Sequence, residues 1–131
     1  MAKAEFLKER AEGFLKDADF DIKEKRWFAA AFHLEQVCQF YLKYYLFLKL
    51  GDFPKTHSLN ELLEDIGRAY EKQKEVKSFL RKNQEIISDL EQAYITARYL
   101  PVEFSKEKIK KMRNFVGKLK KFLKKIYGKI R

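Results

Sequence analysis

Apolar residues recur at three- and four-residue spacing along most of the chain, a pattern typical of helices that bury one face. In residues 3–20 the apolar positions are Phe6, Leu7, Ala11, Phe14, Leu15 and Ala18. The stretch from Asp19 to Lys25 is charged and has no apolar period, so we expect it to be a connection. A long helix is expected over residues 26–50. Gly51 and Pro54 should end it, because Gly favours a helix end and Pro cannot continue a helix.

The second half of the chain shows further helix signals separated by short breaks. Ser58 and Glu61 have the spacing of a capping box at the start of a helix. A short helical piece and a longer helix should follow over residues 76–97, with a break near Asn83. Pro101 should end the longer helix, because the residue before a proline avoids helical geometry.

Ser105 is placed to cap a last helix, residues 105–128, which Gly128 should end. No stretch alternates as a strand would. The pattern therefore predicts an all-α fold, an antiparallel bundle of about five helices. At 131 residues the chain has the size of one domain, so residues 1–131 are expected to form a single unit.

The positive charge of the chain is concentrated in its last segment. The net charge is +10, with +11 in residues 105–131 and −1 in residues 1–104. Six lysines of the last helix form a predicted polyanion face: Lys110, Lys111, Lys118, Lys121, Lys124 and Lys125. Such a face is compatible with simple solvation, with RNA or another polyanion, with an acidic partner, or with a membrane surface.

The single cysteine and the absence of several sequence motifs indicate where the protein is located and which ligands it lacks. Cys38 is the only cysteine, which excludes an internal disulfide and fits a reducing cytosol. It lies among apolar helix positions, so we expect a buried side chain rather than a reactive thiol. No secretory signal or membrane-length apolar run is visible, and a cytoplasmic protein is expected. No zinc spacing or phosphate loop is present, so no metal or cofactor is expected.

Two separated parts of the chain resemble a known family. The first comprises Phe28-Ala29-Ala30-Ala31, Glu35-Gln36, Lys43, and the helix start Thr56-His57-Ser58-Leu59 with Leu62 and Leu63. The second comprises Tyr94, Arg98, Tyr99 and Pro101, spaced as Tyr-x3-Arg-Tyr-x-Pro. In this order they resemble the HEPN domain family (higher eukaryotes and prokaryotes nucleotide-binding) over about residues 3–125.

The resemblance implies a small α-helical fold that partners nucleotidyltransferases or cuts RNA. It suggests a non-catalytic binding module that forms a homodimer and pairs with a separately encoded minimal nucleotidyltransferase, as in toxin–antitoxin systems. Nucleotide or RNA phosphates would then meet Arg98, His57 and Lys43, with Tyr99 stacking on a base. The structural alternative is that His57 packs at a helix start and Arg98 satisfies carbonyls at a helix end.

The same resemblance suggests an alternative, a metal-independent ribonuclease. Catalytic family members carry Arg, four to six residues, then His, late in the chain. No histidine follows Arg98, because His57 is the last one. Arg26 and His33 match the spacing early in the chain and would share a helix face. A divergent enzyme would use them to handle the 2′-OH proton and the phosphate charge.

Overall fold

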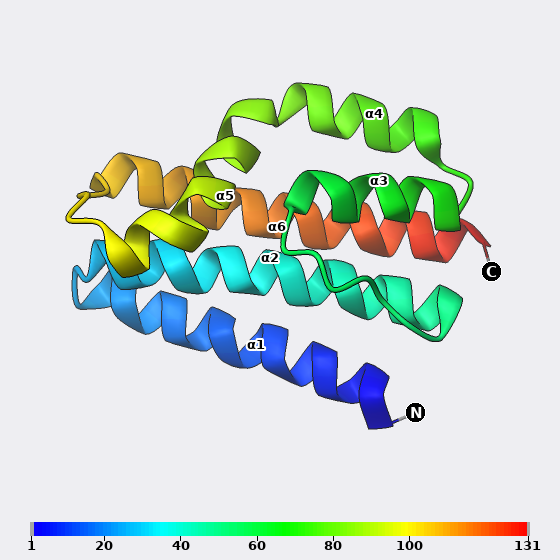
Figure 1. Cartoon of the computed structure of the whole chain (residues 1–131), viewed down its shortest axis with the longest axis horizontal. Helices are drawn as coiled ribbons and strands as arrows, with labels where there is room; N and C mark the ends of the chain where they lie inside the picture. The colour runs from blue at the N-terminus through cyan, green and yellow to red at the C-terminus, as the bar shows by residue number, and fades with distance from the viewer. Residues whose placement is uncertain (1, 131) are drawn as a thin grey trace.

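The computed structural model describes residues 2–130 of the chain, and the side chains of residues 4–128. Residues 2–130 form six helices: α1 (Ala2–Lys23), α2 (Trp27–Leu50), α3 (Leu59–Ala69), α4 (Gln73–Lys82), α5 (Gln84–Tyr99) and α6 (Lys106–Ile130). Figure 1 shows α1 and α2 as an antiparallel hairpin, with α6, α3 and α4 running along the same long axis. The all-α bundle is confirmed, with six helices in place of about five.

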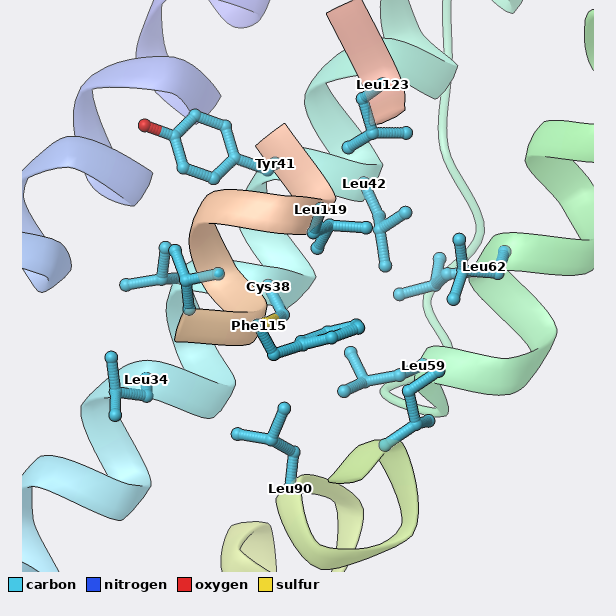
Figure 2. Packing of buried hydrophobic residues seen from close by; sticks show 14 of the residues in the cluster. Leu34, Cys38, Tyr41, Leu42, Leu59, Leu62, Leu90, Phe115, Leu119 and Leu123 are labelled. Carbon is cyan, nitrogen blue, oxygen red and sulfur yellow. The ribbon is translucent and has the colours of Figure 1, made fainter. Parts of the chain in front are cut away.

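Helix α2 is the centre of the bundle, since it packs against α1, α3, α5 and α6. Its residues Leu34, Cys38 and Leu42 follow one another at four-residue spacing and are fully buried. Figure 2 shows this stripe facing leucines of α3 and α5 and the apolar side of α6. Burying each leucine contributes about 1.5–3 kcal/mol before the entropy of ordering is counted. The burial of Cys38 is confirmed.

Three of the predicted helix boundaries are confirmed. Gly51 ends α2 in a left-handed conformation, φ 76°, and its N–H donates to the Phe47 carbonyl. Leu100, which precedes Pro101, is extended and ends α5. The Ser105 hydroxyl accepts from the N–H of Lys108 at 3.0 Å, which caps α6.

Two other boundary predictions are wrong. Residues Asp19 to Lys25 are not a connection, because α1 continues to Lys23. The apolar packing continues there through Ala18 and Ile22. The charged Asp21 is buried and forms a hydrogen bond with the His33 side chain. Helix α6 does not end at Gly128 but reaches Ile130. A glycine favours a helix end when it adopts a left-handed conformation, and among the described glycines only Gly51 has a positive φ.

The break near Asn83 is confirmed and accounts for the sixth helix. The Asn83 backbone N–H donates to the Phe79 carbonyl at 3.1 Å, and its side-chain Nδ2 donates to the same oxygen at 2.9 Å. These bonds end α4 at Lys82, and α5 begins at Gln84 in a new direction. At the other end of α4, Gly67 lets α3 approach closely, because a Cβ there would lie 3.3 Å from the Gln73 Cα and the Val76 Cβ.

Candidate functional site

Helix α2 carries a carboxylate inside the bundle. Glu35 is 0% exposed. Its side chain accepts hydrogen bonds from Gln36 Nε2 at 2.8 Å and from Gln39 Nε2 at 2.6 Å. Burial raises the pKa of Glu35 to about 7, against the opposing effect of these two hydrogen bonds and of the Arg98 and Lys43 charges. This carboxylate therefore changes its charge near neutral pH.

Lys43 continues the same polar row along α2. Glu35, Gln39 and Lys43 follow at four-residue spacing, so they lie on one face of the helix. Lys43 Nζ donates to Gln39 Oε1 at 3.4 Å and lies 5.7 Å from the centre of the Phe53 ring. Burial lowers the pKa of Lys43, and the charge of Glu35 opposes this effect.

Arg98 reaches the same region from the last turn of α5. Its Nε donates to the Tyr94 carbonyl at 2.7 Å, and its guanidinium carbon lies 4.2 Å from the Tyr94 ring centre. The same carbon lies 5.4 Å from the ring of Phe32, one turn before Glu35 on α2. The bond to the Tyr94 carbonyl is the structural role considered for Arg98, and it leaves the two terminal nitrogens as donors for an anion.

His57 joins this group from the loop before α3. Its ring stacks on Tyr94 with centroids 4.3 Å apart and an angle of 17° between the planes. We define the Glu35 cluster by residues that share these contacts or electrostatic effects: Glu35, Gln36, Gln39, Lys43, His57, Tyr94 and Arg98. The structure thus links Lys43, His57 and Arg98, which the family resemblance named as phosphate contacts, through shared neighbours.

Tyr99 takes a more exposed place beside this cluster. Its ring lies 4.9 Å from the Arg98 guanidinium carbon, and the residue is 70% exposed. A face this open is available for stacking.

The start of α3 is held against α5 by a carboxylate that the sequence did not reveal. Ser58 Oγ accepts from the Glu61 N–H at 3.2 Å, which is the predicted half of the capping box. The Glu91 carboxylate supplies a second cap beside the Ser58 hydroxyl. It accepts from the Ser58 hydroxyl and from the Asn60 N–H, both at 3.0 Å. The Ser58 N–H donates to Thr56 Oγ1 at 3.1 Å. These bonds place the His57 loop beside Tyr94, one turn after Glu91.

Arg26 and His33 meet at a third residue, Asp21 of α1. His33 Nδ1 lies 2.6 Å from one Asp21 oxygen, and Arg26 Nε lies 3.9 Å from the other. The Asp21 side chain is 6% exposed, against 25% for His33 and 57% for Arg26. The His33 ring also stacks on Phe14. Asp21 fell within the predicted connection, so this arrangement was not expected from the sequence.

Arg26 also lines a cleft of about 420 Å³ between the start of α2 and the α5–α6 loop. His33 is not among the residues that line this cleft. Arg26 and His33 therefore share a carboxylate, but this cleft does not bring them together.

The six lysines predicted as a polyanion face are all exposed on α6. At about 100° per residue they span an arc of about 140°, so they form one side of the helix. Two neighbouring basic residues are paired. Lys108 Nζ binds Asp89 at 2.7 Å, and Arg113 binds both oxygens of Asp19 at 2.7 and 3.2 Å. The six lysines make no such pairs among the described side chains.

The described part of the chain contains neither a metal-ligand group nor a membrane-spanning helix. Residues 4–128 hold no cluster of three or more His, Cys, Asp or Glu side chains that could bind a metal ion. No helix within residues 2–130 is both long and apolar enough to cross a membrane.

The fold is a small helical bundle, and the polar row Glu35, Gln39 and Lys43 of α2 places ionisable side chains between its helices. These two features define the class of protein as a small all-α domain with a polar site inside the bundle. A family model of the HEPN domain matches residues 4–126, nearly the whole chain. The protein therefore belongs to the HEPN domain family. No curated protein and no solved structure matches it.

Proposed function

We propose that this HEPN protein is a non-catalytic binding module for nucleotide or RNA phosphates, and that it pairs with a minimal nucleotidyltransferase as toxin–antitoxin systems do. The observation that carries the proposal is the Glu35 cluster. It gathers Lys43, His57 and Arg98 from α2, the loop before α3 and α5.

The chemistry of this cluster suits a phosphate. Arg98 is exposed, and a guanidinium presents donors in the planar arrangement that phosphate oxygens accept. Tyr99 beside it offers an open ring face, and stacking of a base on an aromatic side chain contributes about 1–3 kcal/mol. Arg98 and Tyr99 together would bind the phosphate and the base of one nucleotide.

The test is binding of a short fluorescent RNA by wild type, Arg98→Ala and Arg81→Ala, followed by anisotropy without metal. Arg81 is an exposed arginine of α4, outside the cluster, so its variant has the same change in charge. We expect Arg98→Ala to weaken binding about tenfold, the equivalent of about 1.4 kcal/mol, and Arg81→Ala to change it little. Equal losses would show that only total charge matters and would refute the site.

Pairing with a nucleotidyltransferase is tested separately. It predicts that a minimal nucleotidyltransferase is encoded beside this chain and co-purifies with it after co-expression. A purified mixture that elutes as two separate proteins would contradict the pairing and leave the phosphate site standing.

We also propose a homodimer through the end of the bundle where the α1–α2 turn meets the α5–α6 loop (Figure 1). Phe28, Leu100 and Val102 line the cleft there and are 52%, 51% and 44% exposed. Exposed apolar groups gathered in one place favour a second copy as cover. Light scattering should give twice the chain mass, and Leu100→Lys should return it to a monomer. A wild-type monomer would refute this part.

The six-lysine face of α6 is proposed as a secondary polyanion contact. Neutralising Lys121 and Lys125 together with glutamine should reduce the salt dependence of RNA binding, because fewer counterions are released. An unchanged slope of log affinity against log salt would contradict it.

A second candidate function, the divergent ribonuclease, draws support from Asp21. A carboxylate bonded to Nδ1 of a histidine orients the ring, as in acid–base sites, and Arg26 next to it could neutralise a phosphate. Incubation with a mixed RNA pool, without metal, compares wild type with His33→Ala and Asp21→Asn. Cleavage lost in both variants would favour the enzyme over the binding module. No cleavage by any of the three would exclude this function for the pool used.

A further inference from the structure

A second cleft lies between α1, α2 and α6, apart from the Glu35 cluster. Its volume is about 150 Å³, and it is lined by Lys8 and Glu12 of α1, Tyr41, Tyr44 and Tyr45 of α2, and Lys120 and Lys124 of α6. None of these residues belongs to the Glu35 cluster, and only Lys124 was part of the predicted polyanion face.

The cleft contains a buried hydroxyl group with no hydrogen-bond partner in the described part of the chain. Tyr41 is 4% exposed, and its hydroxyl makes no hydrogen bond to the described residues. Figure 2 shows this hydroxyl pointing away from the leucine cluster and toward α1. An unsatisfied buried hydroxyl is costly, so native proteins nearly always give such a group a partner. Burial raises the pKa of Tyr41, which keeps the hydroxyl protonated and able to donate.

The charge of the cleft indicates what kind of partner this is. Three lysines against one glutamate leave an excess of positive charge around a buried donor. Lys120 Nζ lies 5.3 Å from the centre of the Tyr41 ring. A water molecule would satisfy the hydroxyl but would leave the lysine charges uncompensated. An anion would accept from the hydroxyl and would also compensate the lysine charges.

The size of the cleft limits the anion. Sites for drug-sized ligands have volumes of about 300–1,000 Å³, and a water molecule occupies about 30 Å³. A cleft of about 150 Å³ therefore holds one tetrahedral oxyanion and has no room for a base and sugar as well.

We propose that this cleft is a binding site for a phosphate group. The Tyr41 hydroxyl donates to one phosphate oxygen, and the ammonium groups of Lys8, Lys120 and Lys124 balance the charge. The phosphate is either free orthophosphate or the exposed phosphate of a larger molecule whose remainder lies outside the cleft. The site goes beyond the proposed function, since it uses another face of α2.

The experiment titrates the full chain with sodium phosphate at constant ionic strength and pH 7.5, followed by calorimetry and by the shift in melting temperature. The variants are Tyr41→Phe and Lys124→Gln, with Lys106→Gln as the control, because Lys106 is exposed on the same helix but lies outside both the cleft and the six-lysine face. We expect affinity to fall about five- to tenfold in Tyr41→Phe and in Lys124→Gln, and to stay unchanged in Lys106→Gln.

A fourth variant should act in the opposite direction. Glu12→Gln removes the one negative charge of the cleft and should tighten phosphate binding about threefold. Without phosphate, Tyr41→Phe should melt no lower than wild type, because it removes an unsatisfied hydroxyl, and this separates lost binding from lost folding.

Two further titrations distinguish the sources of the phosphate. Adenosine monophosphate and adenosine are compared with orthophosphate in an Arg98→Ala background, so that the Glu35 cluster does not contribute. Tighter binding of the monophosphate than of orthophosphate indicates a phosphate on a larger molecule, and the reverse indicates free phosphate. The proposal is overturned by undetectable binding of orthophosphate and of the monophosphate, by unchanged affinity in Tyr41→Phe, or by an equal loss in Lys106→Gln.

Discussion

His57 and Tyr94 stack face to face, with ring centroids 4.3 Å apart, although one lies in the loop before α3 and the other in α5. The Arg98 guanidinium carbon lies 4.2 Å from the centre of the same Tyr94 ring. Tyr94 is therefore a shared support for two residues proposed to meet phosphate.

The stack should be measurable as a coupling between the two residues. In a double-mutant cycle of His57→Ala and Tyr94→Leu, we expect a coupling free energy of about 0.5–1.5 kcal/mol, the range found for aromatic pairs. Denaturant unfolding of the wild type, both single variants and the double variant gives this value. Additive effects within about 0.3 kcal/mol would show that the stacking contributes nothing to stability.

Glu35 should make stability depend on pH. A carboxyl group whose pKa is raised by folding from 4.5 to about 7 stabilises the fold most below pH 4.5, and this contribution is lost as the pH rises to about 7. Glu35→Gln keeps the shape and stays neutral. The unfolding free energy of Glu35→Gln minus that of wild type should therefore rise by about 3 kcal/mol from pH 4.5 to 8. A constant difference would contradict the raised pKa.

The same carboxylate should control anion binding. Below about pH 7, Glu35 is neutral and no longer offsets the positive charge of Arg98 and Lys43. A short RNA joined only by phosphodiesters keeps its own charge between pH 6 and 8, so its affinity should fall several-fold over this range. Glu35→Gln should flatten the fall. The comparison is repeated in a His57→Ala background, where an equal slope with and without Glu35→Gln would exclude Glu35 as the cause.

The bond between Asp21 and His33 should be a structural contact of measurable strength. Asp21→Ala should lower the unfolding free energy by about 1.5–3 kcal/mol, because it removes a part-buried hydrogen bond to a charged group. Asp17→Ala is the control, since Asp17 is an exposed aspartate of the same helix, and it should change stability by less than about 0.5 kcal/mol. Similar effects of the two variants would mean that the contact is unimportant in solution.

The α1–α2 turn offers a test of backbone strain. Lys25 has φ 57°, in the left-handed region that glycine adopts without steric cost. Lys25→Gly should therefore raise the unfolding free energy by about 0.5–1 kcal/mol. Lys16→Gly, at an exposed position inside α1, should lower it by about 1 kcal/mol. Thermal melts of both variants would check the opposite signs.

The helices and most of their ends could be predicted because they depend on local sequence. Gly51, Pro101 and Ser105 act within a few residues of themselves, and their effects were as expected. Cys38 was likewise expected to be buried from the apolar helix positions around it, and it is. The failure at Asp19–Lys25 arose because a charged stretch was taken to be solvated, whereas Asp21 finds its partner on another helix.

The candidate site was only partly predictable, for a similar reason. Lys43, His57 and Arg98 were named from a family pattern, but nothing local says that they share neighbours. Glu35 appeared in that pattern only as a residue of a Glu-Gln pair, because its burial depends on how the other helices pack on α2. No sequence pattern singled out Tyr41, and only the structure shows that its hydroxyl has no hydrogen-bond partner among the described residues.

The reactivity of the Cys38 thiol can report how often the core opens. Burial raises the pKa of this thiol and keeps it from solvent, and no other cysteine is present in the chain. A disulfide reagent can therefore modify the native protein only when α2 parts from its neighbours. At low reagent concentration the modification rate measures the equilibrium population of opened molecules, and at saturation it measures the opening rate itself.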